Sequence, residues 1–309
     1  MDSGKKKFQI QDPKYKHLLY RLSQVLGLLL GAKVFVVLLL TFALYVSTFF
    51  LFNQEESFKA FVFDFKVHGI IFCTVLSILA GGIINQFYDR EKDRIIKPFR
   101  SQIQNFLKQN YFLYTYLVLN TVSLGISWFI SPRVFVYLIV YQFFMWFYSH
   151  KLSRILILNN LTFVALTLYP FFGMLVYYKT FSLKVFLMAI FLFLFLLIMD
   201  ILKDTLTKNA DKIFGYTTIP NFFGNKITRN VLIFLLLGLM GTSMLLVQQK
   251  GLHTVLSYFF AIGIFVIVVL VTLMANTFKN SNFYALNIMR IWIFLGILSM
   301  LLDGIYSKL

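Results

Sequence analysis

Residues Val185–Met199 read VFLMAIFLFLFLLIM, fifteen consecutive positions without a charge, and Asp200 follows them directly. Such a segment suits the interior of a lipid bilayer, where a helix needs about 20 residues to cross roughly 30 Å of hydrocarbon. A carboxylate at the edge of hydrocarbon is costly, so its presence there indicates a functional role. The stretch therefore predicts a transmembrane helix that carries chemistry at one end.

The rest of the chain repeats this apolar pattern. It has 309 residues, of which 59% are hydrophobic and 13% are charged. Soluble domains carry about 25% charged residues, so the composition excludes a soluble enzyme, a disordered tail protein and a disulfide scaffold. Nine stretches lack acidic and basic residues: Val34–Gln54, Val67–Tyr88, Tyr111–Pro132, Val134–His150, Ile155–Tyr178, Val185–Met199, Val231–Gln249, Gly251–Phe278 and Ile291–Leu302. We therefore expect an all-α fold, a polytopic membrane bundle of about nine transmembrane helices.

Basic residues are distributed unequally between the loops of this bundle. With a cytoplasmic N-terminus, twenty Lys and Arg residues fall on the cytoplasmic side and seven on the other. This bias follows the positive-inside rule and predicts an integral protein of a bacterial-type cytoplasmic membrane. It also accounts for the net charge of +17 without a nucleic-acid partner. Residues 1–22 are expected to form a basic cytoplasmic leader, and residues 23–309 a single nine-helix transmembrane domain.

Six of the twelve acidic residues form two clusters, at the ends of the second and sixth predicted helices. The spacings are four residues in the first cluster, and i, i+4 and i+11 in the second, so each cluster lines one helical face. Two such faces repel unless a cation lies between them. Mg²⁺ suits them because it takes oxygen ligands from one or two carboxylates and completes its shell with water and phosphate oxygens. The candidate ligands are Asn85, Asp89, Asp93, Asp200, Asp204 and Asp211.

Lysine and arginine residues interleave with these acids. A metal–diphosphate complex needs acidic and basic residues together, because the metal binds carboxylates while phosphate oxygens accept hydrogen bonds from basic groups. Each basic residue taken alone is explained equally well by membrane topology or by contact with lipid head groups. The candidate diphosphate-binding residues are Lys97, Arg100, Lys151, Arg154 and Lys203.

These motifs resemble the signatures of the UbiA superfamily of intramembrane prenyltransferases. The first signature is similar to the run from Asn85 to Asp93 with the following Lys97-Pro98-Phe99-Arg100. The segment 148–152, Tyr-Ser-His-Lys-Leu, resembles the tyrosine motif at the end of helix four, and Asn159-Asn160-Leu161 fits the same pattern. Residues 199–224 resemble the second aspartate-rich signature with its trailing Gly, Thr and Pro. The resemblance runs from about residue 24 to residue 303.

The resemblance implies a bundle around a central cavity, in which Mg²⁺ holds a polyprenyl diphosphate. The expected reaction releases pyrophosphate from the allylic carbon, and a lipophilic acceptor captures the carbocation. Asp89 and Asp204 are the expected catalytic carboxylates, and the ring of Tyr148 is expected to stabilise the cation. The expected acceptor is an ether-lipid glycerol phosphate, ahead of a quinone-type head group or a chlorophyll-type alcohol.

Two other functions stay open. Gln86 and Thr207 stand where the family commonly has acids, so the protein could be a catalytically degenerate member that binds a lipid or a prenyl diphosphate. An ion-coupled transporter is less favoured, because the acids lie at helix ends on one side and not at the midplane of broken helices. The expected partners are the polyprenyl diphosphate, the acceptor and membrane lipid, with no obligate protein partner.

Overall fold

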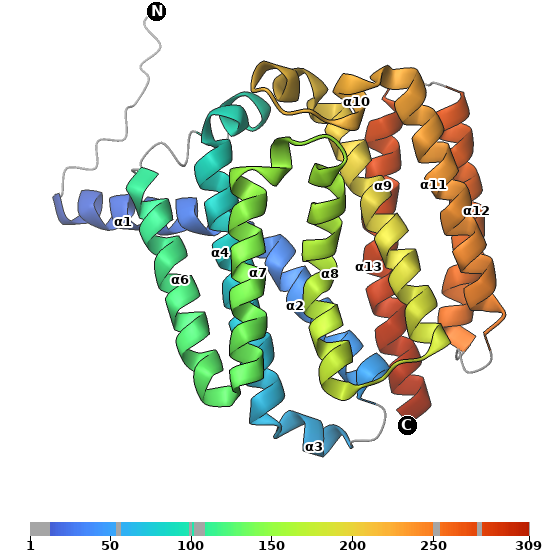
Figure 1. Ribbon diagram of the computed structural model, residues 1–309, viewed down its shortest axis with the longest axis horizontal. Coiled ribbons are helices and arrows are strands. Elements are labelled where there is room, and N and C mark those ends of the chain that lie inside the picture. The colour runs from blue at the N-terminus through green and yellow to red at the C-terminus, as the bar shows by residue number, and fades with distance from the viewer. Residues whose placement is uncertain are drawn as a thin grey trace, which may run out of the picture.

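The computed structural model describes residues 13–53, 57–98, 101, 109–249, 254–276 and 280–308. Throughout these ranges the chain is almost entirely helical and forms no β-strand (Figure 1). The elements are α1 (Pro13–Gly31), α2 (Val34–Ser47) with the π-helical turn η1 (Thr48–Phe52), α3 (Phe58–Val62), α4 (Phe65–Ile96), α6 (Gln109–Ile130), α7 (Pro132–His150), the 3-10 turn η2 (Leu152–Arg154), α8 (Leu158–Tyr178), α9 (Leu183–Ile213), α10 (Ile219–Phe222), α11 (Gly224–Val247), α12 (Thr254–Ala275) and α13 (Ser281–Lys308).

Eight helical segments in the described part of the chain are long and apolar enough to cross a membrane. The predicted span that is not among these eight is Val134–His150, which corresponds to α7; this helix has 19 residues and stands beside α4, α6 and α8 in the same bundle. Its sequence contains Gln142 and several tyrosines, which make it less apolar than its neighbours. The prediction of an all-α polytopic membrane bundle is confirmed, and the expected number of about nine helices is close.

The two helices that carry the acidic clusters are much longer than a bilayer requires. α4 has 32 residues and α9 has 31, whereas about 20 residues are enough to span the hydrocarbon. α4 begins where the Asp64 side chain accepts hydrogen bonds from the backbone N–H groups of Lys66 and Val67. α9 begins where Ser182 accepts one from the N–H of Val185. The excess length lies at the C-terminal ends, so both clusters reach the same end of the bundle (Figure 1).

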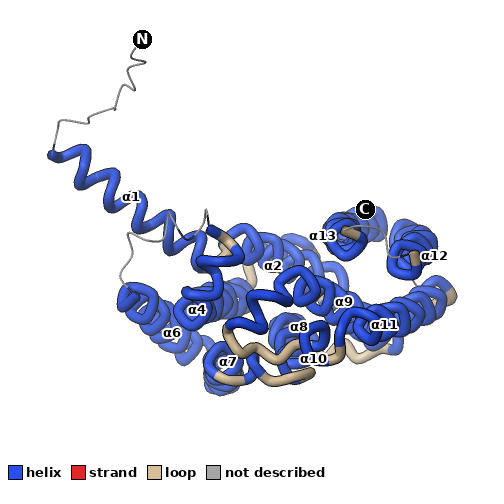
Figure 2. Tube along the Cα trace, turned by 90° about the horizontal axis from the view of Figure 1, so that it is seen from above, coloured by secondary structure: helices blue, strands red, loops and turns tan. Residues whose placement is uncertain are grey.

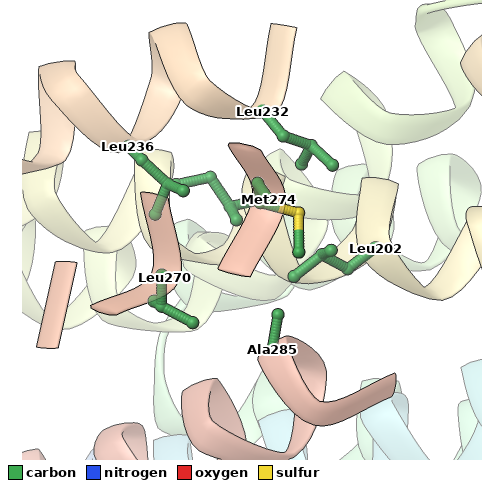
Figure 3. A pocket seen from close by; sticks show the side chains of 7 residues that line it. Leu202, Leu232, Leu236, Leu270, Met274 and Ala285 are labelled. Carbon is green, nitrogen blue, oxygen red and sulfur yellow. The ribbon is translucent and has the colours of Figure 1, made fainter. Parts of the chain in front are cut away.

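The helices of the C-terminal half pack around a close-fitting apolar interior. The side chains between α9, α11, α12 and α13 leave a cavity of about 10 Å³, which is barely enough for one water molecule. Figure 3 shows this space and the aliphatic side chains around it: Leu202, Leu232, Leu236, Leu270, Met274 and Ala285. This interior fixes the position of α9 and offers no room for a substrate.

Hydroxyl and amide groups connect the helices of the other half. The Gln142 side chain on α7 donates a hydrogen bond to the Ser77 hydroxyl on α4 at 2.9 Å. Ser77 in turn contacts the Ser123 hydroxyl on α6 at 3.0 Å, and Ser123 donates to the carbonyl of Cys73 at 2.8 Å. Small polar residues allow close helix approach and hold adjacent helices together where water is excluded. This network holds α4, the helix of the first acidic cluster, against α6 and α7.

Helix α1 runs across the direction of the bundle and projects away from it (Figures 1 and 2). It continues through residues 22 and 23, where the sequence suggested a boundary between leader and membrane domain. The turn after it contains Lys33 in the left-handed conformation, with φ of 54°. This turn touches α4 at Gly82, where a Cβ atom would lie 2.8 Å from the carbonyl oxygen of Ala32. Gly82 lies about one helical turn before Asn85 on α4. Its close contact with Ala32 therefore fixes the turn that carries Lys33 near the first acidic cluster.

Candidate active site

The carboxylates of the second cluster are deeply buried. α9 stays helical to Ile213, so Asp200, Asp204 and Asp211 lie on one face, as their spacing predicts. The three residues are 2%, 4% and 1% exposed, respectively. Ionised carboxylates at this depth require hydrogen-bond donors or cations, because desolvation of an uncompensated charge is costly.

Two adjacent asparagines on α8 supply donors to this cluster. The side-chain amide of Asn160 bridges two carboxylates, at 2.8 Å from Asp200 and 2.9 Å from Asp204. The amide of Asn159 lies 3.3 Å from the same oxygen of Asp204. Lys203 adds an ion pair with Asp200 at 2.8 Å. The oxygen of the Asn160 side chain is buried and has no hydrogen-bond partner, so it remains as an acceptor or ligand beside the two carboxylates.

The first cluster is less buried than the second, and its side chains bond to neighbours on the same helix. The Asn85 amide donates to Asp89 at 2.9 Å, one helical turn away. Asp93 is buried and pairs with Lys97 at 3.0 Å. α4 is helical through Asn85, Asp89 and Asp93, so these side chains lie along one face of the helix, and Lys97 follows them.

Direct contacts join the two clusters. Lys92 of α4 forms an ion pair with Asp211 of α9, with 2.6 Å between the ammonium nitrogen and the carboxylate oxygen. The hydroxyl of Tyr216, which follows α9, donates a hydrogen bond to Asp89. Thr207 donates to the other oxygen of Asp211 at 2.7 Å. The structure thus assembles the acids of the second and sixth predicted helices into one site, next to the connection between α9 and α10.

Tyr216 is held in place by the backbone around it. Its N–H donates to the carbonyl of Asp211 at 2.9 Å, and Gly215 makes the turn possible with φ of 71°. The carbonyl of Tyr216 accepts from the side chain of Asn221. Burial, and then the negative charge of Asp89, raise the pKa of the Tyr216 hydroxyl above its usual value. Tyr216 is therefore a neutral hydrogen-bond donor at physiological pH.

Tyr148 lies near acids of both clusters. Its hydroxyl donates to the side-chain oxygen of Asn159 at 3.0 Å. Asp89, Asp200 and Asp204 are all close enough to interact electrostatically with this hydroxyl. The ring is therefore held beside both acidic clusters, on the element that the sequence indicated.

The predicted diphosphate-binding residues divide into three groups. Lys97 and Lys203 lie in the site, where each neutralises a carboxylate. Arg154 lies over the ring of Tyr216, with 5.3 Å between its guanidinium carbon and the ring centroid, and Lys151 is exposed at the end of α7. Arg100 falls outside the described residues.

Lys33 is a residue of the site that the sequence pattern did not reveal. Its ammonium group interacts electrostatically with Lys203, Lys97, Asp89 and Asp93. It keeps access to solvent but is surrounded by protein atoms, so desolvation and then repulsion by the two lysines lower the pKa of Lys33 to about 8. Sequence periodicity could not place it, because Lys33 reaches the site from a turn between two helices.

The donor set fits a hard divalent cation. Buried carboxylates, the side-chain oxygen of Asn85 and the unpaired oxygen of Asn160 are the ligand types that Mg²⁺ prefers. Within the described ranges, no three Asp, Glu, His or Cys side chains lie close enough together to form a complete metal site. Mg²⁺ does not need such a site, since it usually binds one or two carboxylates and takes its other ligands from water and substrate phosphates.

The fold and site together define a multi-pass membrane protein with a carboxylate- and lysine-lined centre at one end of its bundle. The profile of the UbiA prenyltransferase family matches residues 42–294. The chain therefore belongs to the UbiA prenyltransferase family.

Individual relatives agree with this assignment. Digeranylgeranylglyceryl phosphate synthase of Pyrococcus furiosus is 29% identical over 165 residues, which cover 53% of this chain and 59% of that protein. The enzyme of the same name from Methanosphaera stadtmanae is 31% identical over 155 residues, covering 50% and 56% of the two chains. The alignments thus span little more than half the length of these relatives.

Solved structures share the fold over most of the chain. A structure of digeranylgeranylglyceryl phosphate synthase superimposes with a TM-score of 0.71 at 19% identity, covering 92% of this chain and 99% of the other. A UbiA homologue from Archaeoglobus fulgidus, bound to GPP and Mg²⁺, gives a TM-score of 0.65 at 13% identity, with coverage of 89% and 99%. At these identities the likeness establishes the fold.

Proposed function

We propose that this protein transfers a prenyl group from a polyprenyl diphosphate to a lipophilic acceptor within the membrane, in a reaction that requires Mg²⁺. The main observation behind the proposal is that two acidic clusters, from α4 and α9, meet at one end of an apolar bundle. Membership in the UbiA prenyltransferase family supports it, as do the Mg²⁺, GPP and DMAPP bound to homologous UbiA proteins.

In this proposal the acidic side chains hold the metal ions. When bound, Mg²⁺ offsets the negative charge that develops on the departing pyrophosphate. The ligands would come from Asn85, Asp89, Asp93, Asp200, Asp204 and Asp211, the residues that the sequence indicated. Asp89 and Asp204 are central to their clusters and are the proposed catalytic carboxylates.

The lysines of the site have a second role in the proposal. Lys97 and Lys203 each neutralise a carboxylate in this structure. In the loaded site their ammonium groups would donate to phosphate oxygens instead. Lys33 lies close enough to join them, although it comes from the turn before α2.

The ring of Tyr148 is the proposed stabiliser of the cationic end of the prenyl chain. Its hydroxyl is held by Asn159, and its ring lies 6.4 Å from the ring of Phe163. The face of a fixed aromatic ring attracts a cation, most strongly where water is excluded. We propose that Tyr148 acts through its ring, since its hydroxyl is already committed to Asn159.

The proposed acceptor is an ether-lipid glycerol phosphate. The names of the curated relatives support it, because four of them are digeranylgeranylglyceryl phosphate synthases. We further propose that the acidic end of the bundle faces the cytoplasm of a bacterial-type cell. Of the 27 Lys and Arg residues outside the spans, 20 fall on that side when the N-terminus is cytoplasmic.

Release of pyrophosphate tests the proposed function. The purified protein is mixed with geranylgeranyl diphosphate, an isoprenyl glycerol phosphate acceptor and either Mg²⁺ or EDTA. We expect pyrophosphate and a doubly prenylated lipid only with Mg²⁺, with the lipid identified by mass spectrometry. Tight binding of the prenyl diphosphate without any pyrophosphate release would instead favour the catalytically degenerate binding protein.

A further inference from the structure

A second cavity, with a polar lining, lies beside the acidic site. Its volume is about 240 Å³, far more than a single water molecule needs. It lies between the end of α4, the turn η2 and the connection after α9. The lining residues are Phe87, Tyr88, Arg90, Glu91, Lys92, Arg94, Gln109, Arg154, Phe214 and Tyr216.

The charges around this cavity are mostly positive. Four basic side chains and one acidic side chain line it, which leaves a formal excess of three positive charges. Arg90 and Arg94 are four residues apart on α4, so their side chains lie on the same side of the helix. Arginine binds phosphate and carboxylate groups through paired hydrogen bonds. A cavity with this lining favours an anionic group.

Tyr216 connects this cavity to the acidic site. Tyr216 lines the cavity, and its hydroxyl donates a hydrogen bond to Asp89, which does not line it. The ammonium of Lys92 lies 3.8 Å from the centroid of the same ring and also pairs with Asp211. None of the six candidate metal ligands lines the cavity. An anion bound there is therefore adjacent to the metal-binding residues but not among them.

We propose that this cavity binds the anionic head group of the acceptor, a phosphate monoester on a lipid. The proposal rests on the proposed prenyl transfer and adds the binding site of the second substrate. A prenyl diphosphate needs the metal-binding carboxylates, none of which lines the cavity. A neutral acceptor head group does not need the three arginines that line the cavity. The cavity thus accounts for selection of a phosphorylated acceptor and holds it next to the reacting centre.

The test uses the double variant Arg90→Gln/Arg94→Gln in the full-length purified protein. Arg229→Gln, on α11 and outside the cavity, is the matched control. Initial rates are measured with an isoprenyl glycerol phosphate and with the same lipid after removal of its phosphate. We expect the double variant to raise KM for the phosphorylated acceptor by about tenfold or more. KM for the prenyl diphosphate and for the dephosphorylated acceptor should stay at the wild-type value.

Two kinetic results would overturn the proposal. One is an unchanged KM for the phosphorylated acceptor in the double variant. The other is a matching rise in KM for the prenyl diphosphate, which would make the cavity part of the diphosphate site.

If the wild-type protein shows no turnover, that result counts against the proposed prenyl transfer and not against the head-group site. A binding measurement then tests the head-group site by itself. Affinities for the two lipids and for inorganic phosphate are compared without prenyl diphosphate. The wild-type protein should prefer the phosphorylated lipid, and the double variant should lose that preference. Equal affinity of the wild-type protein for both lipids would reject the head-group site. Binding of inorganic phosphate as tight as that of the phosphorylated lipid would show a free-phosphate site instead.

Discussion

The hydroxyl of Tyr216 donates a hydrogen bond to a carboxylate oxygen of Asp89, which lies 127 positions earlier in the chain. This contact ties the segment after α9 to the acidic end of α4. Together with the ion pair between Lys92 and Asp211, it makes two distant motifs parts of one site.

The first prediction concerns that hydrogen bond. Tyr216→Phe removes the hydroxyl but keeps the ring that Lys92 and Arg154 contact. A hydrogen bond to a charged group contributes about 1.5–3 kcal/mol. We expect a lower melting temperature in the absence of Mg²⁺, measured by thermal unfolding in detergent. Tyr216→Ala should lower it further, because the two cation–ring contacts are also lost; equal melting of Tyr216→Phe and wild type would contradict this role.

The second prediction concerns the carboxylates. Asp89→Ala and Asp204→Ala should each reduce Mg²⁺-dependent turnover by on the order of 10²–10³-fold, the scale of losing one electrostatic stabiliser. Helical content, measured by circular dichroism, should remain. Asp64→Ser is the control, because it keeps an N-cap oxygen at the opposite end of α4. Full activity in both alanine variants would reject the site.

The third prediction concerns Thr207. α9 is helical at this position, and the Thr207 hydroxyl points to Asp211. Since Mg²⁺ affinity rises with the charge of its oxygen ligands, Thr207→Asp should lower the Mg²⁺ concentration for half-maximal activity. Asn209→Asp adds the same charge to an exposed position two residues away and should leave that concentration unchanged. If both variants give the wild-type midpoint, Thr207 is no part of the metal site.

The fourth prediction is a pH dependence caused by Lys33. Desolvation by the surrounding protein atoms, and then repulsion by Lys203 and Lys97, lower the pKa of Lys33 to about 8, although Asp89 and Asp93 oppose this shift. The ammonium group is therefore charged below pH 8 and loses its charge above it. KM for the prenyl diphosphate should rise as the pH increases through 8.

Two variants isolate this effect. Lys33→Arg should remove the rise, because arginine stays protonated at these pH values. Lys33→Gly should give a high KM at every pH without loss of stability, because glycine tolerates the left-handed backbone of this turn. A KM that rises equally in the arginine variant would assign the titration to another group.

The fifth prediction concerns topology. A tag at Met1 should be accessible from the cytoplasm, and a tag at Leu309 from the opposite side. The structure agrees with an odd number of crossings, since α13 ends at the opposite end of the bundle from the acidic clusters (Figure 1). Detection of both tags on the same side would reject this topology.

The sequence predicted the positions of those site residues that repeat with the spacing of a helix. The acids of α4 and α9 could be assigned to faces because both helices are continuous through the clusters. The family resemblance pointed to Asn159 and Asn160, but their donation to Asp200 and Asp204 depends on how α8 packs against α9. Tyr216 and Lys33 could not be predicted, because they enter the site from turns whose backbone conformations carry no periodic signal.

The close contact between Gly82 and the carbonyl of Ala32 has a consequence for genetics. Any side chain at position 82 would push against backbone atoms of the turn that carries Lys33, with 2.8–3.1 Å between them and the new Cβ atom. Backbone cannot rotate aside as a flexible side chain can, so the whole turn must move. A loss-of-function screen would therefore recover Gly82 substitutions with the phenotype of a substrate-binding mutant, although the residue touches no substrate. Suppressors of such alleles should arise in the turn between α1 and α2.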